Sequence, residues 1–299
     1  MTVPQTFEAA PGRLDAVVAQ RLGLSRAEAQ RAIAVRRVLV DGAPRPKSYR
    51  LAGGERVEAD LAGMDELPAE GPPVEVRYRD EHLVVVSKPA GLVTHPSASR
   101  RTGTLVNRLL GMGVPLSTLG GPLRPGIVHR LDAGTSGLMI VACDDATHEA
   151  LAALLKRHEI DRRYLALVRG VVANDRFAVE APLGRVGARV RVHLGAGKQS
   201  ETRLEVLERF ERATLLEAAP RTGRTHQIRV HLSAVGHPIL GDPAYGGTGD
   251  DAKRLGLARA FLHSYRLAFD HPLTGEHIEL EDPLPADLAG ALSELRSEE

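Results

Sequence analysis

The sequence predicts an α+β protein in which a small α+β module precedes a larger domain built on a mixed, mainly antiparallel sheet. Three observations support this fold class. Helical spacing and short strand-like runs share a basic segment at residues 11–60, and a stretch rich in Gly, Pro and acids follows at 61–73. Beyond it, strand-like runs show neither a regular β–α–β alternation nor a fixed repeat. At 299 residues, about two domains are expected.

The module at 11–60 is predicted from apolar spacing, a capping signal and turns. Apolar residues recur at helical intervals from Leu14 to Leu22. Ser25, with Glu28 three residues later, forms the capping-box pattern that starts a second helix. After that helix, "VLVDG" and "LAGGERVEAD" indicate short strands separated by tight turns.

Charge is unevenly distributed along the chain. Residues 13–50 contain nine Lys or Arg and three acids, a net charge of +6, whereas residues 277–299 carry a net charge of −6. The formal total of +1 therefore hides a basic N-terminal segment. Such a segment is either a nucleic-acid-binding surface or ordinary solvent-exposed arginine, and its helix-and-turn pattern favours binding.

We interpret residues 61–73 as a linker and residues 74–299 as one domain. A buried strand is expected from Leu83 to Val86. The further strand-like runs lie at 127–128, 138–142, 164–169, 203–207, 214–218, 227–232 and 277–280. Helical stretches lie near 102–111, 145–157 and 286–296.

Composition excludes several classes of protein. No apolar run reaches the ~18 residues that a membrane span needs, and the N-terminus lacks the pattern of a signal peptide. A single cysteine, Cys143, excludes an internal disulfide and a cysteine-rich zinc site. We therefore expect a cytoplasmic protein that does not contact membranes.

The segment "GIVHRLDAGTSGLMIV", residues 126–141, places polar residues between two apolar runs. We interpret it as strand, loop and strand, with Asp132 in a loop beside a cleft. An alternative is that Asp132 and Thr135 form an Asx-type turn and only satisfy backbone N–H groups.

A second cluster occurs in "TGRTHQIRVHLSAVGHPILGDPAYG", residues 222–246. We expect His226, Arg229 and His231 on or beside one strand. The histidine spacing places the two imidazoles on opposite faces of a strand, which argues against a metal site. Arg229 is suited to neutralise a buried aspartate.

Four segments, in order, resemble the motifs of the RluA/RluD family of RNA pseudouridine synthases. They are "KPAGLVTHP", "HRLDAGTSGL", "RRYLALVRG" and the segment at 222–246. The resemblance covers about residues 75–282. Residues 11–60 resemble the RNA-binding module named after ribosomal protein S-four, with Arg36-Arg37 standing where that module often has a glycine.

The family resemblance implies roles for matching residues. Asp132 is similar to the catalytic nucleophile, Tyr164 to the tyrosine that stacks on the target base, and Arg229 to the arginine that pairs with the aspartate. The expected substrate-binding residues are Lys88, His129, Arg130, Thr135, Arg224, His226 and Gln227. The expected RNA-binding residues of the N-terminal module are Arg26, Arg31, Arg36, Arg37 and Lys47.

The implied reaction breaks the bond between the ribose and a ring nitrogen of uracil and then joins the same ribose to a ring carbon. Atoms are therefore neither gained nor lost. We therefore expect no cofactor and no metal. The expected partner is RNA, either 23S rRNA or a pre-50S particle, bound by a monomer. Three alternatives remain: a tRNA-directed synthase of the same family, a non-catalytic RNA-binding protein, and an N-glycoside hydrolase, which usually needs a second carboxylate.

Overall fold

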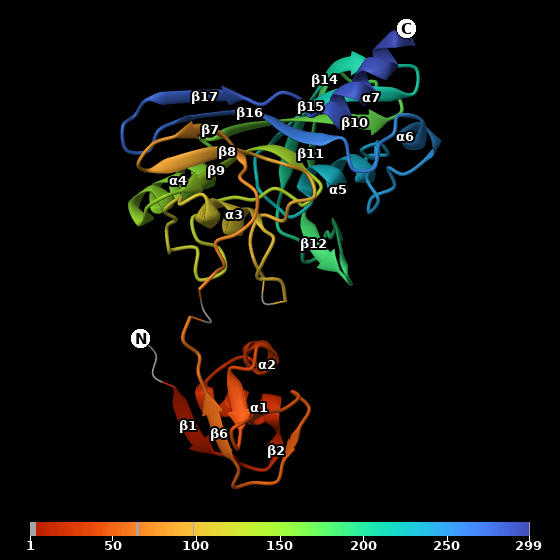
Figure 1. The fold of residues 1–299 in the computed structure, drawn as a ribbon. Coiled ribbons are helices and arrows are strands. Elements are labelled where there is room, and N and C mark those ends of the chain that lie inside the picture. Colours follow the sequence, from red (N-terminus) through yellow and green to blue (C-terminus); the bar gives the residue numbers. More distant parts are fainter. Residues whose placement is uncertain (1–3, 64–65, 98, 299) are drawn as a thin grey trace. The chain divides into compact units, whose positions relative to one another are not determined.

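The computed structural model describes residues 4–63, 66–97 and 99–298, and the chain divides into two compact units (Figure 1). The first unit comprises Met1–Glu70 with Pro96–Thr102, and the second comprises Gly71–His95 with Gly103–Glu299. The expected linker, 61–73, contributes residues to both units, and its residues 64–65 lie outside the described part. Residues 96–102, which the sequence interpretation assigned to the larger domain, group with the first unit.

The first unit contains two short helices and a four-stranded sheet of order β1-β6-β3-β4. Its helices are α1 (Leu14–Leu22) and α2 (Arg26–Ala34). Its strands are β1 (Gln5–Glu8), β2 (Gly12–Arg13), β3 (Val38–Val40), β4 (Ala43–Pro44), β5 (Arg50–Leu51) and β6 (Arg56–Ala59). The capping box is confirmed, because the Ser25 hydroxyl accepts from the Glu28 amide and the Glu28 carboxylate accepts from the Ser25 amide.

The second unit is built on a nine-stranded sheet in which the order β11-β14-β15-β10-β16-β9-β8-β7 is extended by β17 pairing with β16. Among these strands only β9 and β16 pair in parallel, so the predicted mixed, mainly antiparallel sheet is confirmed. The strands are β7 (Glu75–Arg79), β8 (Leu83–Lys88), β9 (Ser136–Ala142), β10 (Asp161–Arg169), β11 (Arg176–Glu180), β14 (Glu201–Arg209), β15 (Ala213–Pro220), β16 (Leu262–Asp270) and β17 (His277–Glu281). A separate hairpin joins β12 (Leu183–Val186) to β13 (Arg189–Val192).

Helices cover both faces of the sheet (Figure 1). They are α3 (Leu105–Gly111), α4 (Asp145–Arg157), α5 (Gln227–Ala234), α6 (Asp250–Arg254) and α7 (Ala286–Ser297). Alternate residues of β8 and β9 enter two different cores, because successive side chains of a strand point to opposite faces. Val84 and Val86 share a core with Leu105 of α3, whereas Leu83 and Val85 share one with Leu151 of α4. This double covering explains the unbroken apolar runs Leu83–Val86 in β8 and Leu138–Ala142 in β9.

The parallel pairing of β9 with β16 fixes the position of Ser136 and Gly137, which follow the Asp132 loop. Ser136 and Gly137 pair with His263 and Ser264. Gly137 has φ 112°, and a Cβ there would lie 2.2 Å from the Ser264 carbonyl oxygen, so only glycine fits.

Two strand predictions were wrong. Residues 227–232 belong to helix α5, and residues 127–128 form no strand, since only Ile127 makes a single bridge, to Val141. The short run Ile228 to Leu232 alternates apolar and polar residues like a strand, but its buried residues also recur four apart, as Gln227 with His231 and Ile228 with Leu232. Burial of both pairs shows that the helical period is the one used.

Candidate active site

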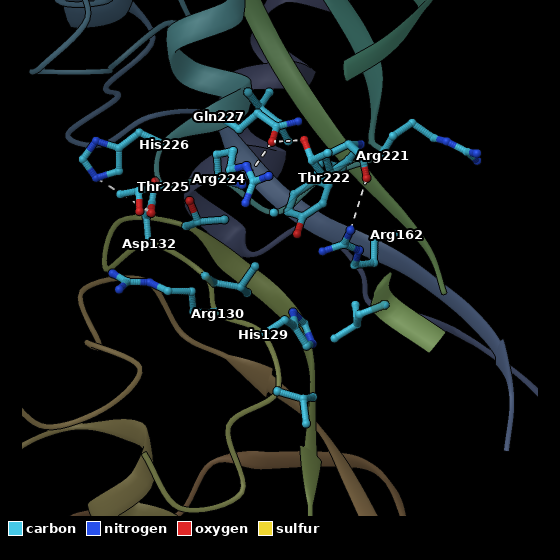
Figure 2. A pocket seen from close by; sticks show the side chains of 18 of the residues that line it. His129, Arg130, Asp132, Arg162, Arg221, Thr222, Arg224, Thr225, His226 and Gln227 are labelled. Carbon is cyan, nitrogen blue, oxygen red and sulfur yellow. Dashed lines mark hydrogen bonds and ion pairs between the residues drawn. The ribbon is translucent and has the colours of Figure 1, made fainter. Parts of the chain in front are cut away.

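A cavity of about 630 Å³ lies in the second unit between the loop that precedes β9 and the loop that precedes α5. Residues 127–132 and 220–229 line it, together with Arg162 and Tyr164 of β10. Figure 2 shows the labelled side chains of these segments around the same space. The two polar clusters identified in the sequence therefore form one pocket.

Arg229 holds the carboxylates of Asp132 and Asp242 together. Its Nε and Nη2 donate to Asp242 at 2.7 and 2.8 Å, and its Nη1 donates to Asp132 Oδ2 at 3.0 Å. Burial alone would lower the pKa of Arg229, but the two carboxylates outweigh it and raise the pKa above the usual arginine value. The predicted contact of Arg229 with Asp132 is present, but the two-pronged partner is Asp242.

Asp132 is not held by an Asx-type turn. The Thr135 amide donates to the Asp132 backbone carbonyl at 3.1 Å, while the carboxylate faces Arg229 and the pocket. Its side chain is 15% exposed, whereas that of Asp242 is fully buried. Asp132 is thus the carboxylate of the pair that a substrate can reach.

Helix α5 directs Arg229 into the pocket, and hydrogen bonds of the Gln227 side chain hold the first turn of this helix in place. The Gln227 side chain accepts from the Thr222 hydroxyl at 2.6 Å and from the Arg224 amide at 3.1 Å. Its amide nitrogen donates to the Glu201 carbonyl and to the Thr202 hydroxyl. Gln227 lines the pocket, but all these bonds are internal, so its main effect is to shape the 222–227 loop.

His226 precedes α5 and faces Asp132. Its Nε2 lies 3.8 Å from Asp132 Oδ1, and its Nδ1 is hydrogen-bonded to the Tyr245 hydroxyl at 2.7 Å. Burial lowers the pKa of His226 more than the Asp132 charge raises it. His231, on the far side of the same helix, is buried against Ser200 and Thr202, so the two histidines do not share a site.

His129 and Arg162 form another part of the pocket wall. The His129 Nε2 accepts from the Ile140 amide at 2.9 Å, which assigns the ring proton to Nδ1. Burial, with a smaller effect of Arg162, lowers the pKa of His129 to about 3. The imidazole is therefore neutral at physiological pH. Arg162 donates from Nη2 to the Pro220 carbonyl at 3.2 Å.

Tyr164 lines the pocket from β10 and also belongs to the core. It is only 6% exposed, and burial raises the pKa of its hydroxyl. Its backbone pairs with Ala218 on one side and with Ser264 on the other. Tyr164 therefore both lines the pocket and packs in the hydrophobic core.

The remaining expected substrate contacts divide into two groups. Arg130, Thr135 and Arg224 line the pocket, Thr135 being buried and the two arginines exposed. Lys88 does not line it: the side chain is fully buried, and its Nζ donates to the carbonyls of Pro89 and Leu92 at 2.9 Å. Burial lowers the pKa of Lys88 to about 7. Its Nζ also donates to the carbonyl of Ala133, next to Asp132, at 3.4 Å, so Lys88 supports the Asp132 loop from behind.

The pocket wall is strongly cationic. Seven Lys or Arg and four His line it, and Asp132 is the one carboxylate among these lining residues. The cations are Arg124, Arg130, Lys156, Arg162, Arg221, Arg224 and Arg229. Such a surface suits a polyanion, and it leaves one anionic group at its centre.

In the first unit, several of the expected RNA-binding residues have partners within the protein. Arg26 donates to Asp15, Arg37 pairs with Asp60, and Lys47 donates to Gln30. Arg31 has a buried Nε without a hydrogen-bond partner among the described residues. Arg36 is exposed and has φ 58°, and it belongs to the Arg36-Arg37 pair that stands where the S-four-like module often has a glycine.

Asp242 and Tyr245 were missed as site residues in the sequence analysis. Both lie in the final Gly-Asp-Pro-Ala-Tyr part of the segment at 222–246, from which the sequence analysis selected no site residue. Their proximity to Arg229 in the chain was the available signal.

The described ranges 4–63, 66–97 and 99–298 contain neither a candidate metal site nor a candidate membrane-spanning helix. No three His, Cys, Asp or Glu side chains there are grouped so that they could hold a metal ion. No helix in the same ranges has the length and apolar character to span a bilayer.

Comparisons with known proteins match parts of both units to known families. Residues 82–234 match the model of the RNA pseudouridylate synthase family, and residues 12–57 match that of the S4 domain. A solved structure, human RNA pseudouridylate synthase domain containing 1, is 28% identical, with a TM-score of 0.58 over 72% of this chain and 86% of that one.

Full-length relatives are similar in sequence. The uncharacterized RNA pseudouridine synthase YlyB of Bacillus subtilis is 40% identical over 91% of this chain and 90% of its own length. The ribosomal large subunit pseudouridine synthase D of Nitrosomonas europaea is 40% identical over 99% of this chain and 88% of its own length. The chain therefore belongs to the RNA pseudouridine synthase family, as an isomerase with an N-terminal S4 domain.

Proposed function

We propose that this protein converts uridine to pseudouridine in large-subunit rRNA, with Asp132 as the nucleophile and without a cofactor. The observation that carries the proposal is the single carboxylate of a cationic pocket, held at 3.0 Å by an arginine that is itself anchored on Asp242. The relatives named ribosomal large subunit pseudouridine synthase D support the choice of rRNA.

Each part of the pocket has a separate role in the proposed reaction. The pocket cations neutralise RNA phosphates, and the target uridine turns out of its helix into the cavity, at a cost of roughly a few kcal/mol. Tyr164 supplies an aromatic face for the base. Asp132 meets the ribose or the base, and Arg229 stabilises the carboxylate charge.

The proposal includes the partners and the setting. The substrate is 23S rRNA or a pre-50S particle in the cytoplasm, and the enzyme acts as a monomer. The first unit adds RNA affinity through its exposed cations, among them Arg36.

The first test uses RNA that carries tritium at C5 of uridine. Wild-type protein should release tritium, and Asp132→Asn should lower the rate by more than about a thousandfold while the RNA dissociation constant changes little. Turnover within tenfold of wild type would remove Asp132 from this role, and release of free uracil would indicate a hydrolase.

The second test identifies the RNA. Pseudouridines are mapped in cells with and without this gene, and a site in 23S rRNA should disappear. Loss of tRNA sites with unchanged rRNA would assign the enzyme to tRNA instead.

A further inference from the structure

His226 has an unusual backbone conformation directly before α5. Its φ of 56° and ψ of 22° lie in the left-handed region, which a residue with a side chain rarely occupies. A conformation of this kind persists only where surrounding contacts hold it. Here the contacts are those of its imidazole, which turns toward the pocket and Asp132 (Figure 2).

Tyr245 fixes the imidazole, and Asp132 favours one of its tautomers. The two rings meet edge to face, with centroids 5.6 Å apart, and the Tyr245 hydroxyl lies 2.7 Å from His226 Nδ1. Nε2 faces the Asp132 carboxylate, so the ring proton is favoured on Nε2, and Nδ1 then accepts from the Tyr245 hydroxyl. Since burial lowers the pKa of His226, the ring is neutral and carries its proton on Nε2.

The Nε2 proton is available to a substrate. Asp132 Oδ1 lies 3.8 Å away, beyond hydrogen-bond distance, and Arg229 takes the other carboxylate oxygen. The His226 side chain is 32% exposed, so Nε2 and Oδ1 are side by side and open to the cavity. Tyr245 also lies against Arg229, with the guanidinium carbon 5.0 Å from its ring centroid.

The chemistry creates a need for a donor at this place. Whether Asp132 attacks the ribose, attacks the ring or removes a ribose proton, the N1–C1′ bond breaks and its electron pair goes to the uracil. The negative charge spreads from N1 onto O2, the carbonyl oxygen next to the breaking bond. Later the C5–C1′ bond forms, C5 loses a proton and N1 gains one, so no co-reactant is consumed.

We propose that His226 is a catalytic residue that donates a hydrogen bond from Nε2 to O2 of the departing uracil, and that Tyr245 positions it. The inference rests on the proposed function of the same pocket. A neutral imidazole suits the task, because it stabilises a developing oxyanion without forming a tight ion pair with Asp132. His226 keeps its proton throughout the reaction.

The test compares variants on a short RNA that carries the mapped target as uridine or as 2-thiouridine, whose sulfur accepts hydrogen bonds weakly. Under single-turnover conditions, His226→Phe should lower the rate on uridine about a hundredfold, with the RNA dissociation constant unchanged within threefold. His226→Gln, which retains an N–H donor, should lose less than tenfold. Circular dichroism spectra and thermal melting like those of wild type show that both variants are folded.

The decisive measurement is the effect of sulfur in each enzyme. Replacing O2 by sulfur should slow the wild type but should alter His226→Phe less than twofold, because the donor is already gone. Arg221→Ala is the matched control: Figure 2 shows Arg221 pointing away from Asp132, and its sulfur effect should equal that of wild type.

Two outcomes would overturn the assignment: an equal sulfur effect in wild type and His226→Phe, or a Gln variant as slow as the Phe variant. Either one leaves the proposed function intact if wild type still makes pseudouridine and Asp132→Asn does not. Absence of pseudouridine with the wild-type protein would instead contradict the proposed function.

Discussion

Each unit of this protein contains a buried carboxylate bound by arginine, and the two clusters are built in opposite ways. In the first unit, Asp15 is fully buried and accepts from Arg13, Arg26 and Gln30. Both arginines remain about half exposed, at 42% and 57%. The anion is the buried centre, and the cations reach the surface.

In the second unit the cation is the centre. Arg229 is 12% exposed and lies between Asp242, which is fully buried, and Asp132, which opens to the pocket. The first arrangement orients positive charge outward, whereas the second directs a carboxylate into the pocket. Under the proposed function, the first arrangement would serve RNA binding and the second would serve chemistry.

The largest expected effect is a difference in stability between variants of the two carboxylates that Arg229 contacts, Asp242 and Asp132. Asp242→Asn should lower the free energy of unfolding by roughly 3–5 kcal/mol, because it leaves a buried guanidinium without its two-pronged partner. Asp132→Asn should cost less than about 1 kcal/mol, since that contact is single and partly exposed. Urea unfolding of both variants measures the difference.

A double variant serves as the control for this comparison. Asp242→Asn combined with Arg229→Ala should lose less stability than the two single losses added together. Equal losses of unfolding free energy in Asp132→Asn and Asp242→Asn would mean that Asp242 holds Arg229 no more strongly than Asp132 does.

An intermediate effect is expected for Asp15. Hydrogen bonds from Arg13, opposed by burial, lower the pKa of this carboxyl well below its ordinary value. A lowered folded-state pKa stabilises the fold above the unfolded-state value, and this stabilisation is lost as pH falls. The stability difference between wild type and Asp15→Asn should therefore be constant from about pH 5 to 7 and shrink below about pH 4.

Thermal melting across this pH range measures the effect, and turnover on a short RNA should be unchanged because Asp15 lies outside the pocket. A stability difference that grows toward acid would contradict the assigned role of Asp15.

The smallest effect is expected for a single exposed arginine of the first unit. Arg36→Gly removes one charge but suits the local φ of 58°, so the fold should not be weakened. If Arg36 contacts a phosphate, the slope of log affinity against log salt should fall by about 0.7–0.9. Arg56→Ala, whose guanidinium pairs with Glu58 in wild type, is the control.

Salt titrations of RNA binding measure both slopes. An unchanged slope in Arg36→Gly would make Arg36 an ordinary surface residue and would weaken the proposal that exposed cations of the first unit bind RNA.

Local sequence patterns predicted those features that depend on near neighbours in the chain. Ser25 and Glu28 are three residues apart, so the helix start that they form could be identified directly. The pairing of Asp132 with Arg229 was expected from family resemblance and from the need of a buried carboxylate for a cation, and the structure contains it. The prediction of RNA pseudouridine synthase activity came from the order of four motifs, and the family comparison confirms it.

Tertiary structure alone decided which residues complete the site. The run Ile228 to Leu232 fits both a strand and a helix, and only burial of Gln227 with His231 selected the helix that directs Arg229 into the pocket. Asp242 and Tyr245 could belong to any surface turn until packing brought them to the same guanidinium. Lys88 was expected to bind substrate, but it is fully buried and supports the Asp132 loop through the Ala133 carbonyl. Sequence specifies which groups are available, whereas packing determines which of them are buried, and burial decides how each charge acts.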